Sequence, residues 1–129
     1  MVEDDLRELW KRITFNILTS DHDDHLRNHG LILSGDEWRL SPAYDLNPVP
    51  DQDTLSLYIT DNDNRRDVNN ALDVCEFFRI KKSEAKEIIV YMQSVITENL
   101  QSSARKYGIS EHELRYMAPA FSECYQDIK

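Results

Sequence analysis

The chain has 129 residues, a length typical of one domain, and 24 Asp and Glu against 15 Lys and Arg give a net charge of −9. This acidic excess argues against direct contact with nucleic acid or an anionic membrane, because phosphates repel an acidic surface. No run of 18 apolar residues occurs and the first residues are acidic, so we expect a cytoplasmic protein with no membrane span, no export signal and two reduced cysteines.

The first element is an amphipathic helix. Apolar residues recur at three- and four-residue steps over residues 3–19, with polar residues such as Glu8, Lys11 and Arg12 between them. Trp10 lies on the apolar face and is expected in the core. Residues 20–30 are polar and without a period, and they contain three Asp and three His, which predicts a loop.

A β-hairpin is predicted next. Residues 31–33 and 38–40 are mostly apolar and flank a polar turn, in which Gly35 can take a positive φ. Trp38 at the end of this turn is expected to be half-buried. After a segment rich in proline, alternating apolar and polar residues predict a short strand over residues 55–60.

The rest of the chain is predicted to be helical. Asp67 is a plausible N-cap for the second helix, and Ser83 for the third. Gly108 suits the position after the end of the third helix. Ser110 and Glu113 have the spacing of a capping box, which opens a fourth helix.

These elements predict one domain over residues 1–129, mainly α with a small β-hairpin region. Cys75 falls on an apolar helical stripe and is expected to be buried. Cys124 lies near the end of the sequence and is expected to be exposed, with no basic neighbour to make it a reactive thiolate.

Three oxygen-bearing residues suggest phosphoryl-transfer chemistry. Asp23 and Asn28 are five residues apart in the polar loop, which is the Asp-x-x-x-x-Asn spacing of a protein-kinase catalytic loop, and Asp45 follows the hairpin. In such a loop the Asp accepts the substrate hydroxyl proton and the Asn binds Mg²⁺, while a second Asp binds the Mg²⁺ that bridges the ATP phosphates. Mg²⁺ is a hard cation that prefers oxygen ligands.

The sequence around these residues extends the similarity over nearly the whole chain. Characteristic runs occur at residues 15–18, 23–30 and 38–46, and further ones at 71–78 and 107–121. Together they resemble the HipA-like serine/threonine kinases, the toxins of bacterial toxin–antitoxin pairs and their relatives. The pair Asp-Asp-His-x-x-Asn-His-Gly and Leu-Ser-Pro-Ala-Tyr-Asp-Leu is the most specific part.

The resemblance implies roles for four residues. Asp23 resembles the catalytic base of the family, and its spacing to Asn28 favours it over the two neighbouring aspartates. Asn28 and Asp45 stand where the family binds its metal, and thereby its nucleotide cofactor. His25 stands two residues after the base, where many eukaryotic kinases have a Lys that contacts the transferred phosphate. The implied cofactors are Mg²⁺ and ATP.

The chain lacks the parts of a kinase that hold ATP. It has three glycines, none placed to form a Gly-rich phosphate loop, and no strand with an ATP-binding Lys precedes the catalytic loop. The resemblance is therefore to the C-terminal lobe, without the N-terminal lobe, and we expect the isolated chain to be inactive. The implied partners are that lobe, a protein substrate (in some relatives an aminoacyl-tRNA synthetase), and a small helix-turn-helix antitoxin through which any DNA contact would pass.

Other functions remain open from the residues. The fragment could be a non-catalytic binding or regulatory module that keeps a surface for the antitoxin or the other lobe, or the lobe of a small-molecule kinase. His22, His25 and His29 could hold zinc, and the carboxylates could serve a two-metal nuclease, although the acidic charge disfavours nucleic acid. Asp23 and Asn28 could also be ordinary residues of a solvated turn.

Overall fold

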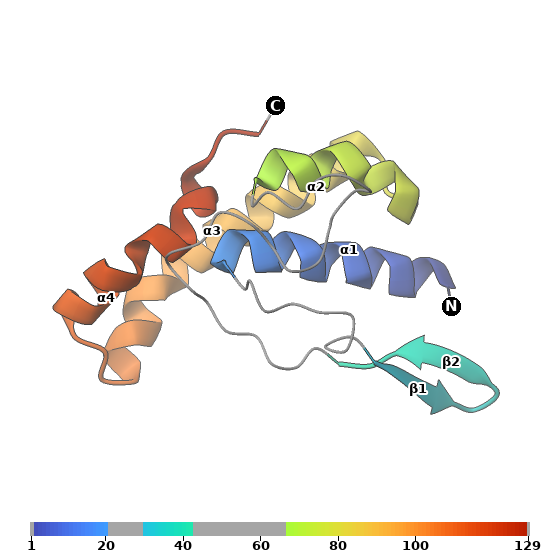
Figure 1. Ribbon diagram of the computed structural model, residues 1–129, viewed down its shortest axis with the longest axis horizontal. Coiled ribbons are helices and arrows are strands. Elements are labelled where there is room, and N and C mark those ends of the chain that lie inside the picture. Colours follow the sequence, from blue (N-terminus) through green and yellow to red (C-terminus); the bar gives the residue numbers. More distant parts are fainter. Residues whose placement is uncertain (1, 21–29, 43–66, 129) are drawn as a thin grey trace.

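The computed structural model describes residues 2–20, 30–42 and 67–128. It is mainly helical, with one small hairpin, as the sequence predicts (Figure 1). The predicted strand at 55–60 lies outside the described residues. Within the described part, no helix is both long and apolar enough to cross a membrane.

Helix α1 (Val2–Thr19) is the centre of the fold. Helices α2, α3, η2 and η3 and strand β2 all pack against it. Its apolar face supplies the largest core side chains, with Trp10 and Ile17 fully buried. The indole Nε1 of Trp10 donates a 2.9 Å hydrogen bond to the carbonyl of Ala71, which ties α1 to α2. The core position expected for Trp10 is therefore confirmed.

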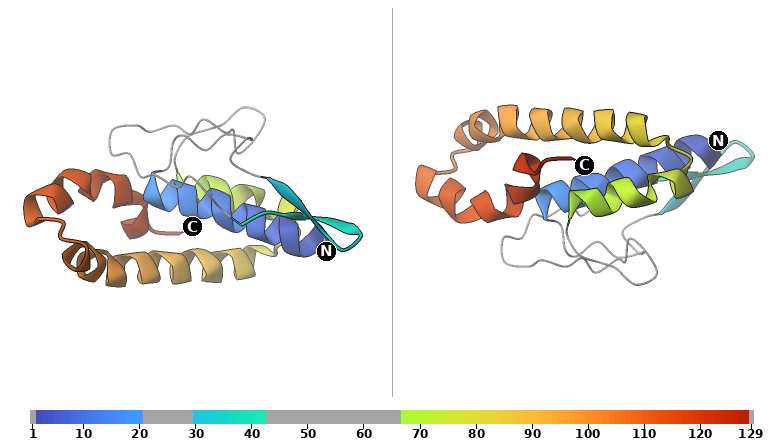
Figure 2. Two further views of the ribbon diagram at one scale, coloured as in Figure 1. Left: turned by 90° about the horizontal axis from the view of Figure 1, so that it is seen from below. Right: turned by 90° about the horizontal axis from the view of Figure 1, so that it is seen from above.

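The hairpin consists of β1 (Leu31–Ser34) and β2 (Glu37–Leu40), paired antiparallel with Leu33 opposite Trp38. Gly35 has a φ of 64° in the turn, as predicted. The hairpin projects beyond the helices at the N-terminal end of α1 (Figures 1 and 2). Trp38 is consequently 65% exposed, so the expectation that it is half-buried is wrong.

Helix α2 (Val68–Val74) runs directly into the 3-10 turn η2 (Cys75–Phe78). Asp67 is the N-cap of α2, and its side chain accepts a 2.9 Å hydrogen bond from the amide of Asn69. Cys75 is fully buried in the core, as expected.

Helix α3 (Lys82–Lys106) is the longest element and lies alongside α1 (Figure 2). Its N-cap is Lys81, so the expectation that Ser83 caps this helix is wrong. A chain reversal with Gly108 at a φ of 74° follows α3, as predicted.

Helix α4 (Glu111–Met117) opens with the predicted capping box, in which Ser110 and Glu113 exchange side-chain and backbone hydrogen bonds. The 3-10 helix η3 (Ala118–Tyr125) then returns to α1. Cys124 in η3 is 6% exposed, and its Sγ lies 3.4 Å from the carbonyl of Leu18. The expected exposure of Cys124 is therefore wrong, because η3 folds back onto the end of α1.

Candidate functional site

The four residues assigned to catalysis and metal binding, Asp23, His25, Asn28 and Asp45, lie outside the described residues. The structure does describe the backbone on both sides of the two segments that contain them. These flanking residues show where the fold fixes the chain before and after each segment.

The first fixed point lies at the base of the hairpin. The amide of Ser41 donates a 2.7 Å hydrogen bond to the carbonyl of Gly30, one pair beyond the strands. Gly30 follows the segment that contains Asp23 and Asn28, while Ser41 precedes the segment that contains Asp45. The end of one motif-bearing segment is therefore paired with the start of the other.

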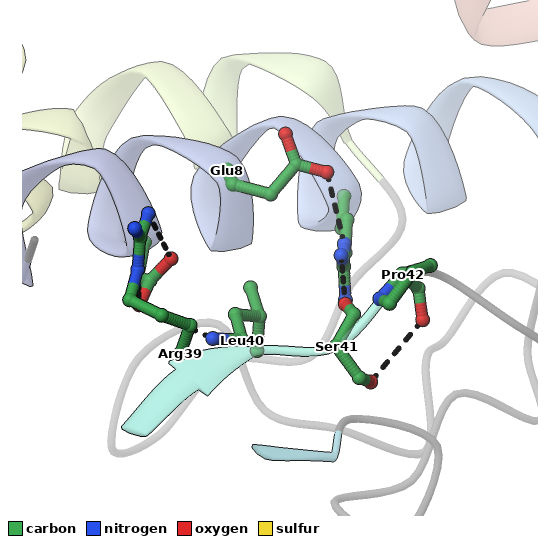
Figure 3. A network of polar contacts seen from close by, with 7 residues as sticks. Glu8, Arg39, Leu40, Ser41 and Pro42 are labelled. Atoms are coloured by element: carbon green, nitrogen blue, oxygen red, sulfur yellow. Dashed lines mark hydrogen bonds and ion pairs between the residues drawn. The ribbon is translucent and has the colours of Figure 1, made fainter. Parts of the chain in front are cut away.

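Helix α1 holds this base from the side through Arg12, whose two acceptors are Glu8 and Ser41. Figure 3 shows Glu8 on the helix and Ser41 at the end of the strand below it. The guanidinium Nη2 of Arg12 donates to the carbonyl of Ser41, and Nε donates to Glu8 over 3.1 Å. The Arg12 side chain is only 8% exposed. The sequence did not predict this burial, because Arg12 lies between the apolar positions of the helix, where side chains are usually exposed.

A second contact fixes the hairpin farther along β2. Asp5 on α1 accepts hydrogen bonds of 3.0 and 3.1 Å from the guanidinium of Arg39 and one of 3.1 Å from the amide of Leu40. The hydrogen bonds from Arg39 are the main reason that the pKa of Asp5 is lowered. Two guanidinium groups thus bridge α1 and the hairpin, Arg12 at its base and Arg39 within β2.

The start of the first segment is fixed by Ser20. This residue follows α1, is fully buried and has a φ of 60°, in the left-handed region that costs a non-glycine residue energy. Its hydroxyl donates to the carbonyl of Ala120 in η3. The chain therefore leaves α1 in a defined direction immediately before the predicted catalytic loop.

The end of the second segment is held by the same 3-10 helix. Val68, the first residue of α2, donates its amide to the carboxylate of the buried Glu123 over 2.8 Å. Gln93 on α3 donates to the carbonyl of Glu123 over 3.0 Å. Helix η3 therefore fixes both the departure of the chain at Ser20 and its return at Val68.

Three buried polar atoms of α1 have no hydrogen-bond partner in the described structure. They are Nη1 of Arg12 and both amide atoms of Asn16, which is 1% exposed. Because residues four apart share a helix face, Glu8, Arg12 and Asn16 form one polar stripe along α1. The four-residue spacing of these polar residues is visible in the sequence, but it does not by itself indicate that Arg12 and Asn16 are buried.

Among the described residues, no three His, Cys, Asp or Glu side chains lie close enough together to bind a metal ion. The histidines considered for zinc, His22, His25 and His29, lie outside this part of the chain. The zinc interpretation therefore stays untested.

Comparison with known families places most of the chain in one of them. Residues 1–100 match the HipA-like C-terminal domain, so the chain belongs to this family. The matched region includes α1, the hairpin, α2 and most of α3, but ends before α4 and η3. No curated protein and no solved structure matches the chain.

Proposed function

We propose that this chain is the catalytic C-terminal lobe of a HipA-like serine/threonine protein kinase, the toxin component of a toxin–antitoxin pair. The observation that carries the proposal is the hydrogen bond between Gly30 and Ser41, in a chain whose first 100 residues match the HipA-like C-terminal domain. That contact joins the chain two residues after Asn28 to the chain four residues before Asp45.

The length of chain on each side of the Gly30–Ser41 contact is compatible with a shared metal site. One residue lengthens an extended chain by about 3.5 Å at most. The Cα atom of Asn28 can therefore be no more than about 7 Å from that of Gly30, and the Cα atom of Asp45 no more than about 14 Å from that of Ser41. These limits permit both side chains to reach one ion. An amide oxygen and a carboxylate are ligands that Mg²⁺ prefers, so the residue types fit the cation.

Each residue then has a distinct role in phosphoryl transfer. The carboxylate of Asp23 orients the serine or threonine hydroxyl of the protein substrate and accepts its proton. Asn28 and Asp45 hold the metal, the amide doing so without adding negative charge near the phosphates. His25 contacts the transferred phosphate. Bound Mg²⁺ supplies neutralisation of the phosphate charge, the dominant need of this reaction.

ATP binding requires a second lobe in this proposal. These 129 residues contain three glycines and no Gly-rich loop, so the phosphates and the adenine need contacts from an N-terminal lobe. The other proposed partners are a protein substrate, such as an aminoacyl-tRNA synthetase, and a helix-turn-helix antitoxin that makes the DNA contacts. The net charge of −9 agrees with indirect rather than direct DNA binding.

The test combines the chain with a HipA-like N-terminal lobe and measures transfer of the ATP γ-phosphate to protein. We expect Mg²⁺-dependent phosphorylation of serine or threonine that Asp23→Ala lowers about a thousandfold. Asp21→Ala and Asp24→Ala are the matched controls, because they remove neighbouring carboxylates at the wrong spacing to Asn28. Transfer that survives Asp23→Ala would contradict the proposal.

A second candidate is a non-catalytic binding module, and the exposed hairpin favours it. Leu31, Leu33 and Trp38 share one face of the hairpin and are 59–65% exposed. Apolar side chains grouped in this way are typical of interaction surfaces. In this case the chain would bind the antitoxin or the other lobe. Trp38→Ser would abolish that binding, and Asp23→Ala would leave it unchanged.

A further inference from the structure

The guanidinium group of Arg12 makes contacts that place it at a junction of the fold. It binds the Glu8 carboxylate on its own helix and the Ser41 carbonyl at the base of the hairpin. The amide of the same residue, Ser41, pairs with Gly30. The Arg12 side chain therefore connects α1 to the backbone hydrogen bond between Ser41 and Gly30.

We propose that Arg12 is a positioning residue for the metal site. It acts through Ser41, whose peptide it fixes against α1, and thereby sets where the segment carrying Asp45 begins relative to Gly30. This inference rests on the proposed function, since it takes Asn28 and Asp45 as the metal ligands.

The burial of Arg12 favours this role over simple stabilisation. Its Nη1 and the amide of the neighbouring Asn16 are buried without hydrogen-bond partners among the described residues, an arrangement that costs stability. An apolar side chain would fill the same face of α1 without that cost. A planar guanidinium, however, can donate to two acceptors in fixed directions, here the carboxylate of Glu8 and the carbonyl of Ser41.

The test measures Mn²⁺ affinity and thermal stability of the 129-residue chain in parallel. Mn²⁺ takes the same carboxylate and carbonyl ligands as Mg²⁺ and is detected directly by electron paramagnetic resonance. We expect Arg12→Met, which keeps an unbranched stem without the guanidinium, to weaken Mn²⁺ binding about tenfold, as the loss of an outer contact does in other metal sites.

Arg7→Met is the matched control on the same helix. Arg7 forms an ion pair with Glu84 on α3 and makes no hydrogen bond or ion pair with the described residues of the hairpin, so its loss removes a comparable interaction elsewhere. We expect Arg7→Met to lower the melting temperature and leave Mn²⁺ affinity unchanged. An equal loss of Mn²⁺ affinity in both variants would show general loosening and overturn the inference.

Two further variants separate this inference from the proposed function. If Asn28→Ala and Asp45→Ala leave Mn²⁺ binding unchanged, the proposed metal site is wrong and the inference falls with it. If they weaken binding but folded Arg12→Met does not, only the inference is wrong. Should Arg12→Met fail to fold, Arg12→Lys decides, because one ammonium cannot reproduce the guanidinium fork. Weaker Mn²⁺ binding by folded Arg12→Lys supports the inference, and unchanged binding overturns it.

Discussion

The amide of Ser41 donates a 2.7 Å hydrogen bond to the carbonyl of Gly30, just beyond the last pair of the β1–β2 hairpin. This contact closes the hairpin at its base, where the chain arrives from the Asp-x-x-x-x-Asn motif and leaves toward Asp45. Arg12 secures the same point from α1. The central helix and the hairpin thus provide a fixed frame for segments that carry the proposed chemistry.

Ser20 offers a test of how the first segment is anchored. Ser20→Ala removes the hydroxyl that donates to Ala120 but keeps the cost of a positive φ, so we expect it to lower the free energy of unfolding by about 1 kcal/mol. Ser20→Gly also loses the hydroxyl but tolerates the left-handed conformation, and should therefore be more stable than Ser20→Ala. Urea denaturation measures both, and an Ala variant more stable than the Gly variant would contradict this account of the junction.

The ion pair between Asp5 and Arg39 predicts a dependence of stability on pH. Hydrogen bonds from Arg39 lower the pKa of Asp5 in the folded chain. The ionised Asp5 carboxylate therefore stabilises the fold above its unfolded pKa of about 3.9, and this stabilisation is lost as the pH falls through the lower pKa of the folded chain. Wild type should exceed Asp5→Asn in stability from about pH 5 to 8, and this difference should shrink below about pH 4. A difference that stays constant down to the acid transition would contradict the assignment.

The two tryptophans predict a fluorescence signature. Trp10 is fully buried and Trp38 is 65% exposed, so acrylamide should quench the native chain in two classes of different accessibility. Trp38→Phe should remove the accessible class and leave blue-shifted emission from Trp10. An accessible class that remains in Trp38→Phe would have to come from Trp10, the other tryptophan of the chain, and would contradict its burial in the core.

The thiols predict slow chemical labelling. Cys75 and Cys124 are both thiols, 0% and 6% exposed, and burial raises the pKa of Cys75, which keeps it in the unreactive protonated form. A disulfide-exchange reagent should therefore label both only as the chain opens, and urea should accelerate the reaction. Cys124→Ser and Cys75→Ser variants identify each thiol. Immediate labelling of either thiol in the native chain would show that the 3-10 helix carrying it, η2 for Cys75 or η3 for Cys124, does not pack as observed.

Local signals predicted much of the fold correctly. The cap at Asp67, the positive φ at Gly35 and Gly108, and the capping box of Ser110 and Glu113 depend on residues within a few positions of one another. Such features can be recognised without knowing the tertiary structure. The helical face around Trp10 followed from periodicity alone.

Features set by distant contacts could not be predicted in this way. Arg12 is buried because Ser41 lies against it, and Cys124 because η3 returns to the end of α1. Trp38 is exposed because nothing among the described residues covers that face of the hairpin. For the site itself, the residue types and their spacing suggested the chemistry. The contacts of Ser20 and Ser41 that fix the chain beside the site became visible only in the folded structure.

The most direct measurement of the central claim is γ-phosphate transfer to a protein serine or threonine by the chain together with a HipA-like N-terminal lobe. We predict transfer that requires Mg²⁺, falls about a thousandfold with Asp23→Ala, and is absent from the 129 residues alone. Transfer that is unchanged by Asp23→Ala, or robust transfer by the 129 residues without the second lobe, would contradict the account.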